Sequence, residues 1–310
     1  MNNIKVKGDT EFAEFARQLQ NDWRVKKGFQ IGSYKNTKGE LIELGNYIEK
    51  KSAFKNGLNF LSLTILEVVN SSLKNKEHGA KIEKTRLFTN LLSSQPLAFN
   101  LFAELAKDPR LASRLFSDLF PDRVSEITGI IFEHSSGRGD CKYTCDHSAF
   151  DVFVTYKSIS NRPGFIGIEV KYSENLKDTP SKHKPHYEEL TLKSKLFREG
   201  SIDILKHRPV QQIWRNHLIS IAHLTHENEG FDEGFFIYLF PKNNKECQIA
   251  VNKYVSLFES YNAETNEFDE KQTGFYIRYL DDIMLNLNQM VGKEWTRELI
   301  ERYLGADINT

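Results

Sequence analysis

Two apolar segments, each interrupted by charged residues, decide the fold of this chain. They read Ala149-Phe-Asp-Val-Phe-Val-Thr-Tyr156 and Phe165-Ile-Gly-Ile-Glu-Val-Lys-Tyr172. Both are rich in β-branched and aromatic residues, a composition typical of β-strands. Between them lies Asn161-Arg-Pro-Gly164, whose residue types favour a turn. We therefore expect the two segments to form a β-hairpin.

The charged residues in these strands are in phase with one another. Alternate side chains of a strand point to the same face, so Glu169 and Lys171 share a face, and a hairpin would bring Asp151 beside Glu169. Buried charges are costly unless they are paired or bind a metal. Two adjacent carboxylates also repel each other unless a hard divalent cation lies between them. The structural alternative, in which Asp151 begins a strand and Glu169 pairs with Lys171, explains three in-phase charges less well.

The remaining sequence predicts a mixed α/β protein. Further strands are expected over 127–132, 234–240 and, more weakly, 275–279. Helices are expected over 210–224, 248–260 and 281–304, and a polar loop over 173–187. Ahead of the strands, residues 9–120 predict a series of helices interrupted by a loop or short hairpin over 28–45. We divide the chain into a helical N-terminal region, a core and a mostly helical acidic C-terminal extension, over residues 1–122, 123–245 and 246–310.

Composition excludes several classes of protein. The chain has 310 residues, of which 39% are hydrophobic, as in folded, soluble proteins. No apolar run approaches the roughly 18 to 20 residues that span a bilayer, and the N-terminus lacks the apolar core of a signal peptide. Three cysteines are too few for a disulfide framework, so we expect a reducing, cytoplasmic location.

The charge of the chain is balanced overall but unevenly distributed. There are 42 lysines and arginines against 42 aspartates and glutamates. Basic residues outnumber acidic ones over 1–226, and the reverse holds over 227–310. A basic portion suits a phosphate backbone, although charged runs are often only solvated surfaces. Zero net charge therefore does not exclude a nucleic-acid partner.

Two other kinds of site find little support. His134, Cys141, Cys145 and His147 are close in sequence, but their spacing differs from that of common structural zinc sites. A turn-rich loop is the simpler interpretation. Neither of the glycine-rich phosphate-binding motifs occurs, so we expect no nucleotide cofactor.

At the charged strands the chain resembles a known family. Asp151 followed by Glu169-Val-Lys171 resembles the signature of the PD-(D/E)XK nuclease superfamily. The neighbouring strings Phe132-Glu-His-Ser-Ser-Gly-Arg138 and Thr85-Arg-Leu-Phe-Thr-Asn90 resemble restriction-endonuclease-like members of it. The resemblance covers about residues 80–225. It implies a restriction-endonuclease-like core, a mixed sheet of about four to five strands flanked by helices, between an N-terminal helical region and C-terminal helices.

The resemblance also implies roles for individual residues. Asp151, Glu169 and the backbone carbonyl of Val170 would bind Mg²⁺, for which Mn²⁺ is the expected substitute. Lys171 would orient or help deprotonate a water molecule and offset negative charge in the transition state. Glu133 is a candidate for a second metal or a metal-bound water, with an ordinary strand-end carboxylate as the alternative.

Further residues are candidates for contacts with DNA. By analogy with related nucleases, Gln212 and Arg215 lie on the helix after the second charged strand and face the same way, at i and i+3. A solvated helix face is the alternative. The other basic candidates near the site are Arg138, Lys182 and Lys184.

The implied activity is that of a Mg²⁺-dependent DNA endonuclease, acting in restriction or a related defence role. A catalytically silent module that keeps the fold and binds nucleic acid or protein is the alternative. The expected partner is DNA and not a membrane. Whether two copies form a homodimer to cut both strands is left open.

Overall fold

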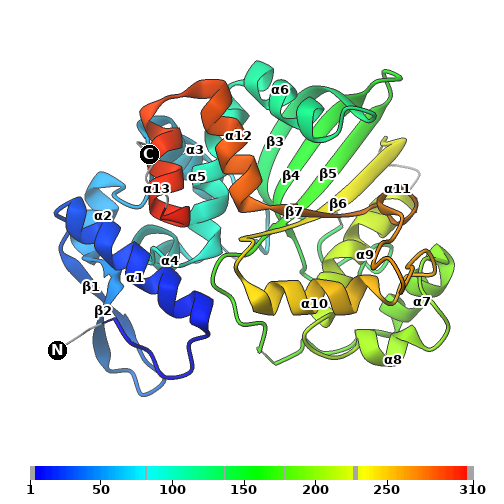
Figure 1. Ribbon diagram of the computed structural model, residues 1–310, viewed down its shortest axis with the longest axis horizontal. Helices are drawn as coiled ribbons and strands as arrows, with labels where there is room; N and C mark the ends of the chain where they lie inside the picture. The colour runs from blue at the N-terminus through cyan, green and yellow to red at the C-terminus, as the bar shows by residue number, and fades with distance from the viewer. Residues whose placement is uncertain (1–3, 81, 136, 178, 226–229, 306–310) are drawn as a thin grey trace.

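A five-stranded mixed β-sheet forms the centre of the molecule (Figure 1). The computed structural model describes residues 4–80, 82–135, 137–177, 179–225 and 230–305. The strands lie in the order β3-β4-β5-β6-β7. Their bounds are Val124–His134 for β3, Phe150–Ser158 for β4, Pro163–Val170 for β5, Glu233–Phe240 for β6 and Phe275–Tyr279 for β7.

The predicted hairpin is confirmed, because β4 pairs with β5 in antiparallel register. β3 pairs antiparallel with β4 on the other side. β6 and β7 then extend the sheet with parallel pairings. The expectation of an α/β fold with a mixed sheet of this size is therefore confirmed, and the weakly predicted strand at 275–279 is its edge strand.

Helices cover both faces of the sheet because its strands are apolar on both sides. Val152, Val154 and Ile166 pack on one face, under α5 (Ser94–Lys107), α6 (Pro109–Leu119) and α12 (Leu280–Val291). Phe153 and Phe165 pack on the other, against α7 (Pro185–Ser194), α9 (Gln211–Thr225) and α10 (Lys245–Val255). Figure 1 shows these two helical layers above and below the sheet. The short helices α8 (Ser201–Leu205) and α11 (Glu270–Thr273) lie in the connections.

The part of the N-terminal region that precedes α5 packs beside the sheet. It holds a two-stranded hairpin, β1 (Ile31–Lys35) and β2 (Leu41–Ile48), which confirms the hairpin alternative for this stretch. Its helices are α1 (Glu11–Lys26), α2 (Lys50–Asn56), α3 (Leu63–Lys74) and α4 (Lys84–Thr89). Within the described residues, no helix is long and apolar enough to cross a membrane.

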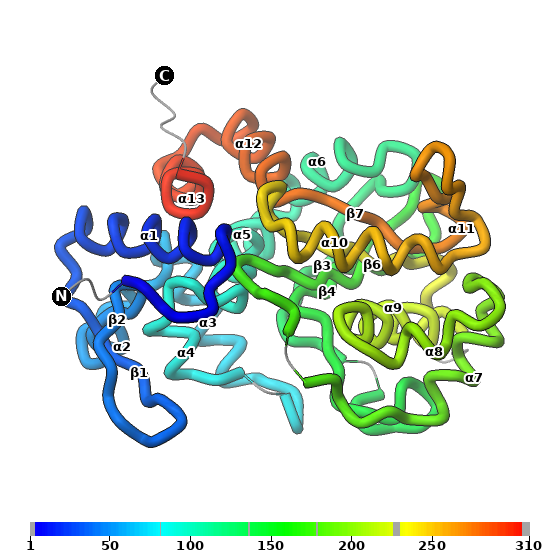
Figure 2. The backbone as a smooth tube through the Cα atoms, turned by 60° about the horizontal axis from the view of Figure 1, so that its bottom comes forward, coloured from blue at the N-terminus to red at the C-terminus, as the bar shows by residue number. Residues whose placement is uncertain are grey.

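The two ends of the chain are joined through a buried arginine. Arg302 of α13 (Glu294–Leu304) is fully buried. Its guanidinium donates to Gln20 Oε1 at 3.0 Å and to the carbonyl of Asn59 at 2.8 Å. Figure 2 shows α13 beside α1. Because a buried guanidinium without partners is costly, this network fixes the N-terminal region against the C-terminal helices.

Some predicted elements have different bounds in the structure. The helix expected over 281–304 is two helices, because Gly292 adopts a left-handed conformation with φ 60° and ends α12. The loop expected over 173–187 gives way to α7 at Pro185, where proline suits the first helical turn. The helix expected over 248–260 is α10, which begins earlier and ends at Val255.

Candidate active site

The two strand carboxylates lie side by side at the carboxyl end of β5. Val152 pairs with Ile168, and continuing this antiparallel register by one residue places Asp151 opposite Glu169. Asp151 Oδ2 accepts a hydrogen bond from the backbone N–H of Val170 at 2.7 Å. Asp151 is half-buried, whereas Glu169 and Lys171 are only 4% and 6% exposed. The strand phase therefore brings three charged groups together, two of them buried and one half-buried.

Helix α9 supplies amide groups to Glu169. Glu169 Oε1 accepts from Lys171 Nζ at 2.6 Å and from Gln212 Nε2 at 3.1 Å. Its Oε2 accepts from Asn216 Nδ2 at 2.6 Å, and Gln212 Oε1 also accepts from Lys171 Nζ at 3.2 Å. Asn216 was not predicted from the sequence. It lies one turn after Gln212 on the same helix, and this spacing could have identified it. Both oxygens of Glu169 are thus held in place.

A third carboxylate approaches from β3. Glu133 has a left-handed backbone, with φ 56°, which is uncommon for a residue other than glycine. Its Oε1 accepts a hydrogen bond from Gln95 Nε2 of α5 at 2.5 Å, and its carbonyl accepts one from Arg138 at 2.9 Å. Burial, together with the charge of Glu169, raises the pKa of Glu133 despite the bond from Gln95.

The charges of the cluster perturb one another. Burial raises the pKa of Asp151 well above its ordinary value of 3.8, and the charges of Glu169 and Glu133 raise it further. Burial opposes the charge on Lys171, but Glu169 and the other neighbouring carboxylates outweigh this effect and raise the pKa of the ammonium. Lys171 is therefore protonated at neutral pH, beside carboxylates that repel one another.

Two hollows meet at these carboxylates. The larger, of about 590 Å³, extends from Lys171 along residues 173–176 and 179–181. The smaller, of about 240 Å³, extends toward Glu133 and Arg138. Five residues line both hollows, namely Arg86, Asp151, Glu169, Gln212 and Arg215. The carboxylates thus lie at the junction of a continuous groove that is open to solvent.

A family model described as the PD-(D/E)XK nuclease superfamily matches residues 7–305. The chain belongs to the PD-(D/E)XK nuclease superfamily. Comparisons with curated proteins and with solved structures each found no match. The match covers the N-terminal region, the sheet and the C-terminal helices alike, so the superfamily assignment holds for the chain as a whole.

The acidic groups of this PD-(D/E)XK chain have the chemistry that a hard divalent cation requires. Among the described residues, no group of three or more His, Cys, Asp or Glu side chains is placed so that it could hold a metal ion by itself. The charge of Glu169 nevertheless raises the pKa values of Asp151 and Glu133, and carboxylate and carbonyl oxygens are the ligands that Mg²⁺ prefers. By their chemistry, Asp151, Glu169 and the Val170 carbonyl would therefore suit the divalent metal that PD-(D/E)XK nucleases generally use.

Of the basic residues predicted to bind DNA in this PD-(D/E)XK chain, the two arginines line the hollows and the two lysines do not. Arg215 lines both hollows, but it is ion-paired with Asp146 at 2.9 Å. Arg138 lines the smaller hollow and pairs with Glu77 at 3.2 Å. Lys182 is exposed, and Lys184 is half-buried at the start of α7. Neither lysine lines a hollow, although both follow the loop that does.

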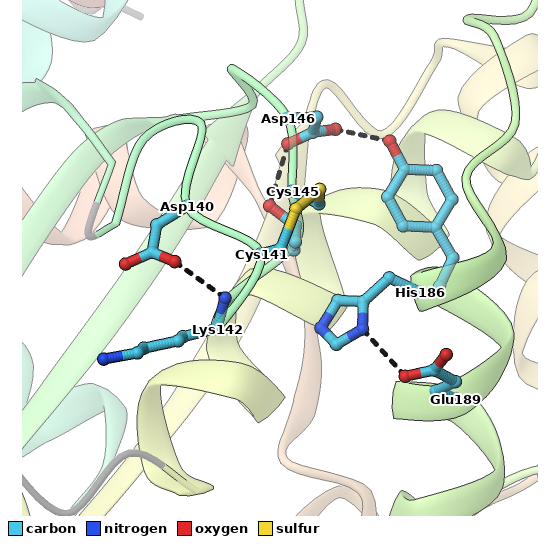
Figure 3. Close-up of a disulfide and its surroundings, with 9 residues drawn as sticks. Asp140, Cys141, Lys142, Cys145, Asp146, His186 and Glu189 are labelled. Carbon is cyan, nitrogen blue, oxygen red and sulfur yellow. Dashed lines mark hydrogen bonds and ion pairs between the residues drawn. A yellow bond between two sulfur atoms is a disulfide. The ribbon is translucent and has the colours of Figure 1, made fainter.

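Two of the four residues weighed for a zinc site, both in the loop between β3 and β4, are joined to each other. Cys141 and Cys145 form a short-range disulfide (Figure 3). Asp146 follows directly and accepts a hydrogen bond from Tyr187 at 2.6 Å, so that the loop is fixed against α7. Because Asp146 also binds Arg215, this loop sets the position of one basic side chain in the groove.

Proposed function

We propose that this protein is a Mg²⁺-dependent endonuclease that hydrolyses phosphodiester bonds in DNA. The observation that carries the proposal is the cluster of half-buried Asp151 with buried Glu169 and Lys171 where two hollows meet. Superfamily membership supports the reaction class. The role in restriction or a related defence rests only on the resemblance to restriction endonucleases.

Asp151, Glu169 and the carbonyl of Val170 would hold the metal, and Glu133 would complete the site or bind a second ion. When bound there, a divalent cation supplies Lewis-acid chemistry, polarising the phosphate and acidifying water. The geometry supports this assignment because Val170 N–H fixes Asp151, while Gln212 and Asn216 fix Glu169. Pre-oriented ligands reduce the reorganisation needed for binding.

Lys171 would act as a fixed cation. Its protonated Nζ lies 2.6 Å from Glu169 Oε1, on the face that lines the larger hollow. A buried positive charge stabilises the negative charge that develops on a phosphate during hydrolysis. A protonated ammonium has no lone pair to accept a proton, so we assign Lys171 to charge stabilisation and water orientation and not to general-base catalysis.

The test is cleavage of supercoiled and linear duplex DNA by the purified protein with Mg²⁺ or Mn²⁺. We expect Asp151→Asn, Glu169→Gln and Lys171→Ala each to abolish cleavage while the far-ultraviolet circular dichroism spectrum is unchanged. Glu126→Gln, at an exposed carboxylate on β3, is the matched control and should cut normally. Cleavage by Glu169→Gln at the parental rate would refute the assignment. DNA binding without cleavage would favour the catalytically silent module.

A further inference from the structure

The N-terminal region contributes one basic side chain to the groove. Arg86, from helix α4, lines both the larger and the smaller hollow, together with Asp151 and Glu169. Arg86 is exposed. The described residues place no carboxylate within ion-pairing distance of it, whereas Arg215 and Arg138 are paired with Asp146 and Glu77. Arg86 is thus a cation at the junction of the hollows whose charge is not matched by an ion pair.

The backbone that carries Arg86 is anchored on both sides. The three residues that follow it, Leu87, Phe88 and Thr89, are all buried. The carboxylate of Glu83 caps the start of α4 and accepts from the backbone N–H groups of Thr85 and Arg86. Because the backbone is already ordered, less conformational entropy is lost when the guanidinium binds a ligand. The region is therefore suited to presenting Arg86 toward the groove.

A phosphate that enters the groove meets three carboxylates, so its binding needs a nearby cation. Asp151, Glu169 and Glu133 would repel an approaching phosphate, and Lys171 is already paired with Glu169. A guanidinium offers two parallel N–H donors that match the oxygens of a phosphate. A cation that lines the same hollows as the carboxylates would attract the phosphate toward them without competing for the metal ligands.

We propose that Arg86 is a phosphate-binding residue, which contacts the DNA backbone at or beside the scissile phosphate. This inference rests on the proposed nuclease function and adds a residue from outside the superfamily signature. Contacts to phosphate position a strand without reading its sequence. Arg86 is therefore expected to contribute to affinity and alignment, and to do so equally for substrates of different sequence.

The test compares Arg86→Ala and Arg86→Lys with Lys84→Ala. Lys84 is an exposed residue two positions earlier on the same helix, and it lines neither hollow. Binding of a fluorescent duplex oligonucleotide is measured by anisotropy at several salt concentrations, with Ca²⁺ in place of Mg²⁺. Cleavage of the same duplex is then measured with Mg²⁺ under single-turnover conditions, and thermal melting checks the fold of each variant.

We expect Arg86→Ala to weaken binding roughly tenfold, as for the loss of one charge-assisted hydrogen bond. The slope of log affinity against log salt should fall by about one. Arg86→Lys should lie between Arg86→Ala and the parent, and Lys84→Ala should remain within about twofold of the parent. Equal affinity and salt slope for Arg86→Ala and the parent would overturn the proposal.

The two proposals fail in distinguishable ways. If the parent binds DNA but does not cut it, the nuclease function is refuted, while the anisotropy data still decide whether Arg86 contacts phosphate. If the parent cuts DNA and Arg86→Ala cuts and binds equally well, only the Arg86 proposal is refuted. If the parent neither binds nor cuts DNA, both are refuted.

Discussion

Replacing the carboxylate of Asp151 should stabilise the metal-free protein. Asp151 is opposite Glu169 in the β4–β5 pair, and directly opposite residues have Cβ atoms roughly 5 Å apart. At this separation, two unit charges with an effective dielectric constant of about 20 repel by roughly 3 kcal/mol. Lys171, paired with Glu169, offsets part of this repulsion, and Glu133 adds to it. We expect Asp151→Asn to raise the free energy of unfolding by about 1 to 3 kcal/mol.

The substitution isolates charge from hydrogen bonding. The amide oxygen of asparagine can still accept from the N–H of Val170, which lies 2.7 Å from Asp151 Oδ2. For a chain of this size the gain corresponds to an increase in Tm of roughly 2 to 6 °C. The assay is thermal melting at pH 8 in EDTA. Asp118→Asn, at an exposed carboxylate on α6, is the control and should change stability by less than about 0.5 kcal/mol.

The difference in stability between Asp151→Asn and the parent should increase with pH. The pKa of Asp151 is raised in the folded state, so the folded protein binds more protons than the unfolded chain above the ordinary value of 3.8. The parent therefore loses stability as the pH rises from about 3.8 through the folded pKa. The asparagine variant lacks this loss, so the two proteins should be similar in acid and should differ most at neutral and alkaline pH.

Adding Mg²⁺ should make the parent more stable than Asp151→Asn. Mg²⁺ at about 100 times its Kd stabilises the protein that binds it by about 2.7 kcal/mol, and the parent should gain this more fully than the variant. An Asp151→Asn protein that melts at or below the parental Tm in EDTA at pH 8 would refute the idea that the carboxylates repel one another. A pH-independent difference would refute it equally.

Three other substitutions test the neighbours of the cluster. Asn216→Ala should cost about 1 to 3 kcal/mol, measured by denaturant unfolding, because it leaves Glu169 Oε2 buried without its donor. Gln95→Leu should reduce cleavage roughly tenfold by releasing Glu133. It should lower Tm by less than Asn216→Ala does, because Glu133 is only half-buried and Gln95 Oε1 is already buried without a partner, and a loss of stability as large as that of Asn216→Ala would contradict this. Lys171→Met should lower the free energy of unfolding by the same amount at every pH below the ordinary lysine pKa of 10.5, because the pKa of Lys171 is raised in the folded protein. The difference in stability between Lys171→Met and the parent should disappear only at more alkaline pH. A difference that shrinks between pH 6 and 9 would contradict this prediction.

The strand positions of the site could be predicted because they follow a local rule. Period-two alternation and one turn signal were enough to place Asp151 beside Glu169, since both act within a single hairpin. Gln212 was predicted from the resemblance to related nucleases, and the structure places it against Glu169, on a helix that packs back on the sheet. These relations depend on short stretches of chain and on the regular geometry of strands and helices.

Other features depend on tertiary structure that no local pattern encodes. The left-handed backbone of Glu133 and its bond to Gln95 join segments from different regions of the chain. Arg215 pairs with Asp146 because the loop before β4 folds over α9, which its sequence does not reveal. The division of 281–304 into two helices was missed although Gly292 was visible, because a glycine inside a helical pattern is only a weak breaker.

Gln95 and Arg86 show that the N-terminal region takes part in the candidate site. Both lie before residue 123, yet one holds Glu133 and the other lines the groove beside Asp151. The same region is fixed to the C-terminal helices through Arg302, and α5, α6, β4, β5 and α12 share one hydrophobic cluster. A fragment limited to residues 123–245 would lack a wall of the groove and the cover of one sheet face. The acidic signature therefore depends on flanking regions that supply the fold, the orientation of Glu133 and a positive charge lining the groove.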